Sequence, residues 1–428
     1  MSVGIIQVGQ CGNQIGFNIF NNLINEMTKS SECLTQIIAD TYFTISDSNQ
    51  LYANALLIDM EAKVIEKCLK SAKSSNWNYN KSSIIHKQSG SGNNWANGFF
   101  HHGPTIEEKF VETLSSFSEK FDYLDSVILI NSLAGGTGSG LGSYVALLLK
   151  DYFPEINLLN IAVWPHNSGE VIVNSYNTLL SISENYKVSD LMTIIHNQDI
   201  YDICKDIYQI KKIGFEHLNT VISKHIINMM VPPLGEDVSL KAKPFQLNSF
   251  ISEIIYALGL NPKLKFNRII STPEVSPENL KFTNNSWSSL VKRGCQMMGN
   301  RSNESRIDWT SKQTISNNSI ISIYRGRNLN EIPTETENNV IKHCSDNNIK
   351  SKEYRDVNGI NGYEKHFTIL SNSNYYSEDI NRTLRKVYEM YEYNAFIHQY
   401  EKYGLEKSDF IEAFAFCEQV NYDYTCVN

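Results

Sequence analysis

The sequence contains no cysteine pair at C-x-x-C spacing, no cluster of basic residues and no apolar run long enough to cross a bilayer. Because its eight cysteines are scattered, the common zinc-binding and disulfide-exchange motifs are excluded. A formal net charge of −8 argues against a general nucleic-acid-binding protein. The N-terminus also lacks the charged and apolar regions of a signal peptide. These absences predict a reduced, intracellular, soluble protein with no membrane insertion.

The 428 residues are too many for one hydrophobic core and predict two or three domains. In the first half of the chain, short apolar runs alternate with helical patterns. Strands are expected at Val3–Val8, Asn54–Ile58, Val127–Ile130, Leu158–Val163 and Leu191–Ile195. Helices are expected at Gln10–Met27, Thr105–Phe121, Leu141–Tyr152, Glu170–Tyr186 and Asp199–Tyr208. This alternation predicts an α/β fold, a parallel sheet with helices on both faces, in a first domain over residues 1–197.

The second half of the chain has a mixed pattern. One long helix is expected at Phe215–Met230, where apolar residues recur at helical spacing until Pro232-Pro233 ends it. Probable strands are Phe266–Ser271, Ile320–Arg325 and Phe367–Ser371, and two last helices are Asp379–Tyr393 and Lys407–Val420. We therefore predict a core helix and a second α+β domain over residues 198–372, followed by a C-terminal helical region, 373–428.

The most informative segment is Ser132–Gly142, a glycine-rich turn between an expected strand and an expected helix. Glycine permits positive φ and close approach of the backbone to a ligand. Unpaired N–H groups of such a turn, together with the positive end of the following helix dipole, suit phosphate. The segment fits neither the dinucleotide pattern G-x-G-x-x-G nor a Walker loop, since Leu141 stands where the Walker lysine is required. Backbone N–H groups, Thr137 and a metal must then replace that lysine.

Three further turns could join this site, although each has an ordinary explanation when taken alone. Gln7–Gln14 links a strand to a helix and places Gln10 and Gln14 on one helix face, but it could be a simple βα turn. Asp59 and Glu61 share a face in extended chain and could hold Mg²⁺, or they could be solvated loop acids.

The third turn is Gln88–Gly98, in which Gly90 and Gly92 let the backbone close on a ligand and Asn93 offers an amide to phosphate oxygens. It could equally be a surface loop.

Gly9–Gln14 and Gly135–Gly140 match the signatures of one family residue for residue. Over nearly its whole length the chain resembles the tubulin family, which has a bacterial relative that builds the division ring. Within that family it is most similar to the delta class. The supporting stretches are Gln88–Gly98, Trp164–Val173, Ser175–Asn177 and Ala395–Tyr400.

The resemblance implies GTP and Mg²⁺ as ligands, with Asp59 and Glu61 serving the metal. The residues implied to contact GTP are Gln10, Cys11, Gln14, Gly92, Asn93, Ser132, Gly135, Gly136, Thr137, Gly138, Glu170, Asn174, Asn197, Phe215 and Asn219. Asn197 and Asn219 would read the guanine edge and Phe215 would stack on the ring. Two positions depart from the family pattern: Asn174 replaces a ribose-binding Glu, and Phe215 replaces a Tyr.

The resemblance also implies that a neighbouring subunit completes GTP hydrolysis, because the nucleotide site itself contains no evident general base. The matching stretch is Phe245–Glu253, in which Glu253 and Asn248 would act on the neighbour's GTP. Phe250 stands where an Asp is usual, so one acid of that contact is lost.

Three functions follow from this reading. The first is an assembly-coupled GTPase subunit of the centriole or basal body in the cytoplasmic cytoskeleton, with other tubulins as partners: epsilon-tubulin above all, and alpha- or beta-tubulin in a microtubule lattice. The second is a structural subunit that binds GTP and never hydrolyses it. The third is a nucleotide-dependent metabolic enzyme, for which His101-His102 are the only candidate catalytic groups and are interpreted as loop histidines.

Overall fold

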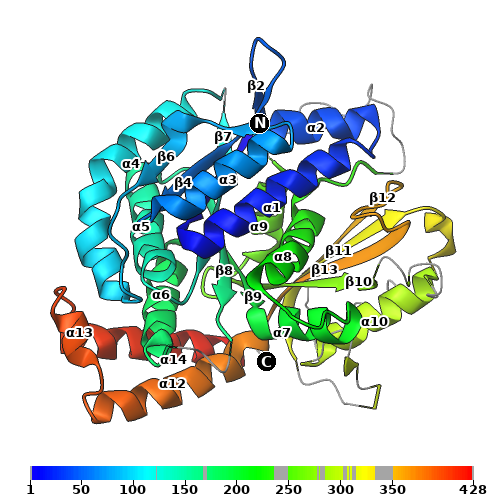
Figure 1. The fold of residues 1–428 in the computed structure, drawn as a ribbon. Helices are drawn as coiled ribbons and strands as arrows, with labels where there is room; N and C mark the ends of the chain where they lie inside the picture. The colour runs from blue at the N-terminus through cyan, green and yellow to red at the C-terminus, as the bar shows by residue number, and fades with distance from the viewer. Residues whose placement is uncertain are drawn as a thin grey trace.

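The computed structural model describes residues 2–121, 123–166, 171–235, 249–276, 279, 285–301, 306–307, 309–310, 315–332 and 350–426. Most strands belong to one ten-stranded sheet in the order β12-β11-β13-β10-β9-β8-β7-β1-β4-β6 (Figure 1). In chain order these are β1 Ser2–Val8, β4 Ala55–Asp59, β6 Ile84–His86, β7 Leu124–Ser132, β8 Asn157–Trp164, β9 Leu191–His196, β10 Phe266–Thr272, β11 Asn317–Gly326, β12 Lys350–Asp356 and β13 Lys365–Ser373.

The sheet is parallel from β6 to β10, and only β13 runs antiparallel to both of its neighbours, β10 and β11. The predicted α/β fold is therefore confirmed. The pairing of β9 with β10 is short, since only Met192 with Phe266 and Thr193 with Asn267 are in register. This short contact joins the strands of the predicted first domain to those of the second in a continuous sheet. The predicted domain boundaries themselves stay a prediction.

Helices cover both faces of the sheet. Successive side chains of a strand point to opposite faces, so Val3 and Ile5 of β1 pack in one core while Ile6 and Val8 pack in another. The first core includes α1 Gly9–Met27, α8 Phe215–Met230 and α9 Phe250–Leu258. The second includes α4 Gly103–Ser118 and α5 Gly142–Tyr152.

A third core forms where the C-terminal helices pack on α6 Asn174–Val188. These helices are α12 Ser377–Glu392, the short α13 Ile397–Glu401 and α14 Lys407–Cys426. In Figure 1 they lie together in orange and red beside α6. The remaining α-helices of the described residues are α2 Glu32–Tyr42, α3 Ala62–Ser74, α7 Asn197–Asp202 and α10 Trp287–Gly299. A small second sheet contains β2 Phe43–Ile45, β3 Leu51–Ala53 and β5 Asn78–Tyr79. No helix of the described residues has the length and apolar character to span a bilayer.

Several sequence-based expectations need correction. The helix expected at Glu170–Tyr186 begins at Asn174, because Val171 to Val173 form a turn in which Asn174 N donates to Val171 O. The helix expected at Asp199–Tyr208 is α7 followed by a π-helical turn, Ile203–Ile207. His101-His102 lie in another π-helical turn, Asn97–His102, and not in a loop, because this turn runs directly into α4.

Candidate nucleotide-binding site

A cavity of about 950 Å³ opens at the carboxyl ends of the parallel strands. It collects every predicted GTP and Mg²⁺ ligand that the structure describes: Gln10, Cys11, Gln14, Asp59, Glu61, Gly92, Asn93, Ser132, Gly135, Gly136, Thr137, Gly138, Asn174, Asn197, Phe215 and Asn219. Glu170 and Asn248 lie outside the described residues. The roles assigned to all these residues stay predictions, but their convergence from separate turns into one cavity is an observation.

The order of the strands gives the cavity a direction. Asn197 follows β9, the glycine loop follows β7, Gln10 follows β1 and Asp59 ends β4. In the sheet β9 and β4 are four strand spacings apart, which is roughly 19 Å at the usual spacing between strands. The site is thus long and has distinct ends, as a ligand with a base at one end and phosphates at the other requires.

The glycine loop that follows β7 packs backbone to backbone against the segment that contains Trp95 and Gly98, where the π-helical turn Asn97–His102 begins. A Cβ on Gly98 would collide with the carbonyl oxygen of Gly136, and one on Gly140 would collide with that of Trp95. Gly135 has φ +79°, the left-handed region that glycine adopts at little cost. These glycines therefore let the two segments close together beside the cavity.

Polar contacts hold the same loop in place. Asn131 Nδ2 donates to Gly138 O at 2.9 Å, and the hydroxyls of Ser91 and Thr137 lie 3.0 Å apart. Ser132 Oγ accepts from Ala134 N at 3.1 Å. The loop is thus fixed by the protein before any ligand is considered.

The β9 end of the cavity suits a planar base. Phe215, the first residue of α8, is 60% exposed although it is apolar and lines the cavity. Its ring face is available for stacking. One turn further along α8, Asn219 Nδ2 donates to Gln14 Oε1 at 2.9 Å, so these two predicted ligands already orient each other.

The β4 end of the cavity holds the two acids. Asp59 is 4% exposed, and its Oδ1 accepts from Glu61 N at 3.4 Å. Burial raises the pKa of Asp59 to about 6, and the nearby Glu61 carboxylate adds to the rise. Asp59 Oδ2 is buried without a hydrogen-bond partner among the described residues. A buried carboxylate oxygen without a partner, beside a second carboxylate, fits a divalent cation.

No group of three or more His, Cys, Asp or Glu gathers as a metal site within the described part of the chain. Mg²⁺ is commonly held by one or two carboxylates together with phosphate oxygens and water, so the residues present fit it only in the company of a bound phosphate.

Cys11 also lines the cavity, and burial raises the pKa of its thiol to about 12. At neutral pH it is therefore a neutral thiol and not a nucleophilic thiolate.

Glu253 is the one described residue of the prediction that lies elsewhere. Ser252, its neighbour in α9, lies 2.8 Å from Ser126 Oγ at the start of β7, whereas Ser132 at the end of β7 lines the cavity. The six residue steps from Ser126 to Ser132 span roughly 20 Å along a strand. Glu253 therefore lies near the opposite end of the sheet from the cavity and cannot reach a nucleotide bound in its own chain.

Sequence reasoning missed some residues of the cavity, among them Pro165, His166, Gln198 and Tyr201. Pro165 and His166 come directly after β8, so the rule that ligands sit beyond the carboxyl ends of strands could have found them. Gln198 and Tyr201 carry no motif and could not be singled out.

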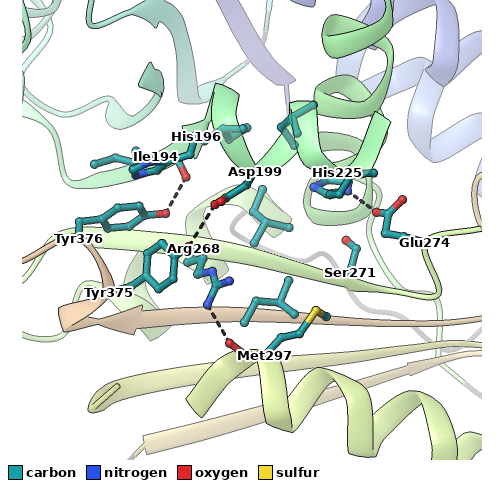
Figure 2. A pocket seen from close by; sticks show the side chains of 15 residues that line it. Ile194, His196, Asp199, His225, Arg268, Ser271, Glu274, Met297, Tyr375 and Tyr376 are labelled. Carbon is teal, nitrogen blue, oxygen red and sulfur yellow. Dashed lines mark hydrogen bonds and ion pairs between the residues drawn. The ribbon is translucent and has the colours of Figure 1, made fainter. Parts of the chain in front are cut away.

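A second, smaller cavity of about 60 Å³ lies between β9, α7, α8 and β10 and contains none of the predicted ligands (Figure 2). Many of its polar groups bond to the protein: Tyr375 donates to Asp199 Oδ2 at 3.1 Å, Tyr376 donates to Ile194 O at 2.7 Å, and Arg268 donates to Met297 O at 2.9 Å. The bonds to Ile194 and Asp199 hold β9 and α7, the strand and helix that meet at Asn197.

The fold and the large cavity at the carboxyl ends of the strands define a nucleotide-binding protein of the tubulin and FtsZ class. The family model described as "Tubulin/FtsZ family, GTPase domain" matches residues 2–205. The chain belongs to the tubulin family. It is 31% identical to the tubulin delta chains of Mus musculus and Homo sapiens and 30% identical to that of Macaca fascicularis, in each case over 99% of both chains. The predicted family and the resemblance to the delta class are confirmed, and the GTPase-domain match makes this a tubulin-like GTP-binding subunit.

Proposed function

We propose that this chain is a delta-tubulin-like subunit that binds GTP with Mg²⁺ in centriole or basal-body microtubule assemblies, and that it hydrolyses GTP only after a neighbouring subunit covers the nucleotide. The observation that carries the proposal is the convergence of all described predicted ligands into one long cavity. The base would lie at the β9 end against Phe215, Asn197 and Asn219, and the phosphates would run past the glycine loop toward β4.

Asp59 and Glu61 would hold the metal, which neutralises charge on the phosphates when it is bound. The backbone N–H groups of Gly135 to Gly138 would take the role of the missing Walker lysine. Gln10, Gln14 and Asn93 add neutral side-chain amides. The described residues of the cavity would thus supply phosphate donors and metal ligands, and the group that orients the attacking water would come from elsewhere.

The missing group would come from Glu253 of the next subunit. This residue lies near the opposite end of the sheet, so a head-to-tail arrangement of subunits brings it to the neighbour's cavity while its own chain cannot use it. A carboxylate there would orient the attacking water. Hydrolysis would therefore depend on assembly. Other tubulins would be the partners, epsilon-tubulin first among them.

The alternative is a structural subunit that keeps GTP intact. Two observations favour it: Phe250 stands where the family has an Asp, and the Glu253 carboxylate already bonds within its own chain to Tyr354 and Lys352. Both accounts require GTP and differ only in turnover.

The first experiment is nucleotide extraction from gently purified protein, followed by rebinding of GTP with magnesium. Guanine nucleotide recovered in near-stoichiometric amount is expected, and protein that stays empty when offered GTP would overturn both accounts. Phosphate release with and without partner tubulins then separates turnover from fixed binding. A tagged chain is expected at centrioles or basal bodies in cells.

A further inference from the structure

Asn177 is a fully buried residue of α6 whose side-chain amide makes three hydrogen bonds to distant parts of the chain. Its Nδ2 donates to Asn93 O at 2.8 Å, and its Oδ1 accepts from Trp95 N at 3.0 Å. The same Oδ1 accepts from the hydroxyl of Tyr400 at 2.7 Å. One side chain therefore joins the Asn93 loop, α6 and α13.

A second contact joins the same loop to α13. Asn94 Nδ2 donates to Gln399 O at 3.1 Å, while Asn94 Oδ1 accepts from Asn97 N at 3.0 Å. Gln399 and Tyr400 are adjacent in α13, so the loop is held to this short helix at two neighbouring points. Buried polar groups with all partners in place make a rigid connection, because each bond lost leaves an unsatisfied group.

The loop lies at one particular end of the nucleotide cavity. Asn93 has φ +53° and lines the cavity with Gly92. Gln88 forms a β-bridge with Glu61, and a Cβ on Gly90 would lie 2.7 Å from Glu61 Oε1. The loop therefore adjoins the acids that follow β4, where the last phosphate of a nucleotide would lie if its base is at the β9 end.

The chain enters α13 through an unusual backbone. Asn394 has φ +49° and Phe396 has φ +62°. A bulky residue in the left-handed region is held there by its surroundings at some cost. Ala395 N donates to Met390 O at 2.8 Å and closes this turn. The backbone at Asn394 and Phe396 is therefore expected to change conformation when the contacts that hold it are lost.

We infer that Asn177 is a positioning residue that fixes Asn93 beside the terminal phosphate of the bound nucleotide and couples that phosphate to α13. Because Asn177 and Asn94 both connect the loop to α13, loss of the terminal phosphate loosens the loop and α13 together. His398, Gln399 and Glu401 are exposed on α13, so its surface differs between the triphosphate and diphosphate states. The inference rests on the proposed binding of GTP.

The test compares the affinities of purified protein for GTP and GDP in the variants Tyr400→Phe and Asn177→Ala. Tyr400→Phe removes only the hydroxyl that orients the amide, and is the gentler change. We expect GTP affinity to fall about tenfold, the size expected for one lost buried hydrogen bond, while GDP affinity stays within about twofold. The control Tyr42→Phe removes an equally buried hydroxyl, which donates to Met230 O at 2.8 Å and does not contact the loop, and is expected to leave both affinities unchanged.

Equal losses for GTP and GDP, or no loss in folded variants, would overturn the coupling. Wild-type protein that binds neither nucleotide would instead overturn the proposed function, so the two failures are distinguishable. Hydrogen exchange of wild-type protein gives a second measurement that needs no variant. We expect the amides of Ile397–Glu401 to exchange several-fold more slowly with GTP than with GDP, and equal rates would contradict the inference.

Discussion

The hydroxyl of Tyr354 on β12 donates a hydrogen bond to Glu253 Oε2 on α9 at 2.7 Å. Lys352 Nζ lies 3.0 Å from the same oxygen, and the ring of Phe250 meets that of Tyr354 edge-on at 5.2 Å. Burial raises the pKa of the Tyr354 hydroxyl, and the Glu253 carboxylate raises it further. The acid that would serve a neighbour's nucleotide is thus held by its own chain, and under the proposed mechanism it would have to be released before it could act.

Glu253→Ala is expected to leave GTP binding intact and to lower phosphate release from assembled protein by ~100-fold, as loss of a water-orienting carboxylate does. Tyr354→Phe, which frees the carboxylate of one bond, is expected to retain or raise the rate. The exposed acid Glu412 provides the control, since Glu412→Ala should change neither binding nor release. Unaltered release in the Glu253 variant would favour the non-hydrolysing subunit.

Asp59→Asn removes the buried carboxylate charge at the β4 end of the cavity. The wild-type protein is expected to bind GTP more tightly with Mg²⁺ than with EDTA, whereas the variant should lose most of this difference. Isothermal titration in both buffers measures it. Glu66→Gln, on an exposed position of α3, is expected to keep the full magnesium effect. If Asp59→Asn kept it as well, the metal would have to be held by other groups.

Asp356→Ala is expected to destabilise the fold strongly. Asp356 and Arg325 are almost completely buried, and their charged groups lie 3.1 Å apart. Removing the carboxylate leaves a buried guanidinium without its partner charge, at a typical cost of about 3–5 kcal/mol in unfolding free energy. Glu364→Ala breaks an exposed pair with Arg327 and should cost below about 1 kcal/mol. Urea denaturation of the two variants gives the comparison.

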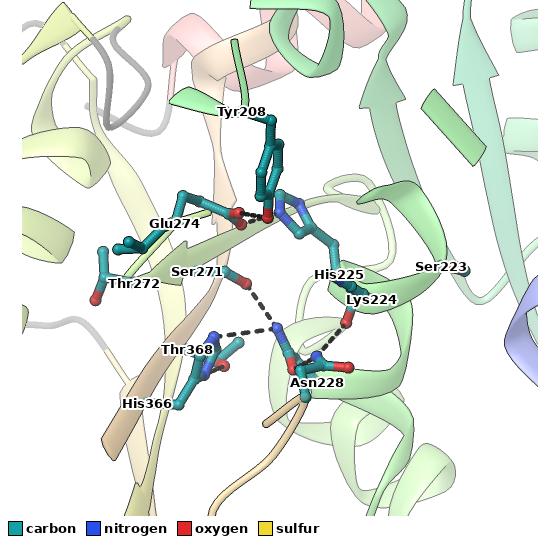
Figure 3. Close-up of polar contacts among 12 residues, drawn as sticks. Tyr208, Ser223, Lys224, His225, Asn228, Ser271, Thr272, Glu274, His366 and Thr368 are labelled. Carbon is teal, nitrogen blue, oxygen red and sulfur yellow. Dashed lines mark hydrogen bonds and ion pairs between the residues drawn. The ribbon is translucent and has the colours of Figure 1, made fainter. Parts of the chain in front are cut away.

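His366 should lower stability as the pH drops from 7 to 5, whereas Asp59, whose pKa is raised by burial, should contribute in the opposite direction. His366 on β13 contacts Asn228 of α8 through Nε2 and Thr368 of its own strand through Nδ1 (Figure 3). Burial lowers its pKa, the nearby Glu274 carboxylate opposes this, and Arg325 and His225 add to the lowering, so that the pKa is about 3. Because the unfolded histidine binds a proton near pH 6.5 and the folded one does not, His366 alone should cost about 2 kcal/mol at pH 5.

The variant His366→Gln should lose that part of the pH dependence, measured as unfolding free energy at pH 7 and pH 5. Burial also lowers the pKa of His196, so some dependence should remain. The exposed His398→Gln should behave as the wild type. Identical pH profiles for His366→Gln and the wild type would show that His366 is not the group responsible.

The sequence predicts local elements and glycine loops well, and for a physical reason. Strands such as β1, β7 and β8 are buried on both faces, so they appear in the sequence as continuous apolar runs. A loop that admits a phosphate needs glycines, and these can be read from the sequence without knowledge of the fold. Short helices such as α9 and α13 were missed, because few residues carry their pattern and tertiary packing decides their conformation.

The connections between elements could not be predicted. Asn177 is 84 residues from Asn93 and 223 residues from Tyr400, and nothing local in the sequence indicates that one amide joins them. The same holds for Glu253 with Tyr354, whose pairing depends on where β12 lies in the sheet. The sequence therefore predicts many of the residues that enter the cavity, whereas only the fold shows what holds them there.

The short contact between β9 and β10 has a mechanical consequence. A subunit in a filament carries pulling and bending forces, and two registered residue pairs are the narrowest hydrogen-bonded link between the nucleotide-bearing strands and the rest of the sheet. Under tension the pairing between β9 and β10 should break first. The nucleotide-bearing strands would then stay intact while β10 and the strands beyond it tilt, so tension along a filament would change the angle between adjoining subunits before it released their GTP.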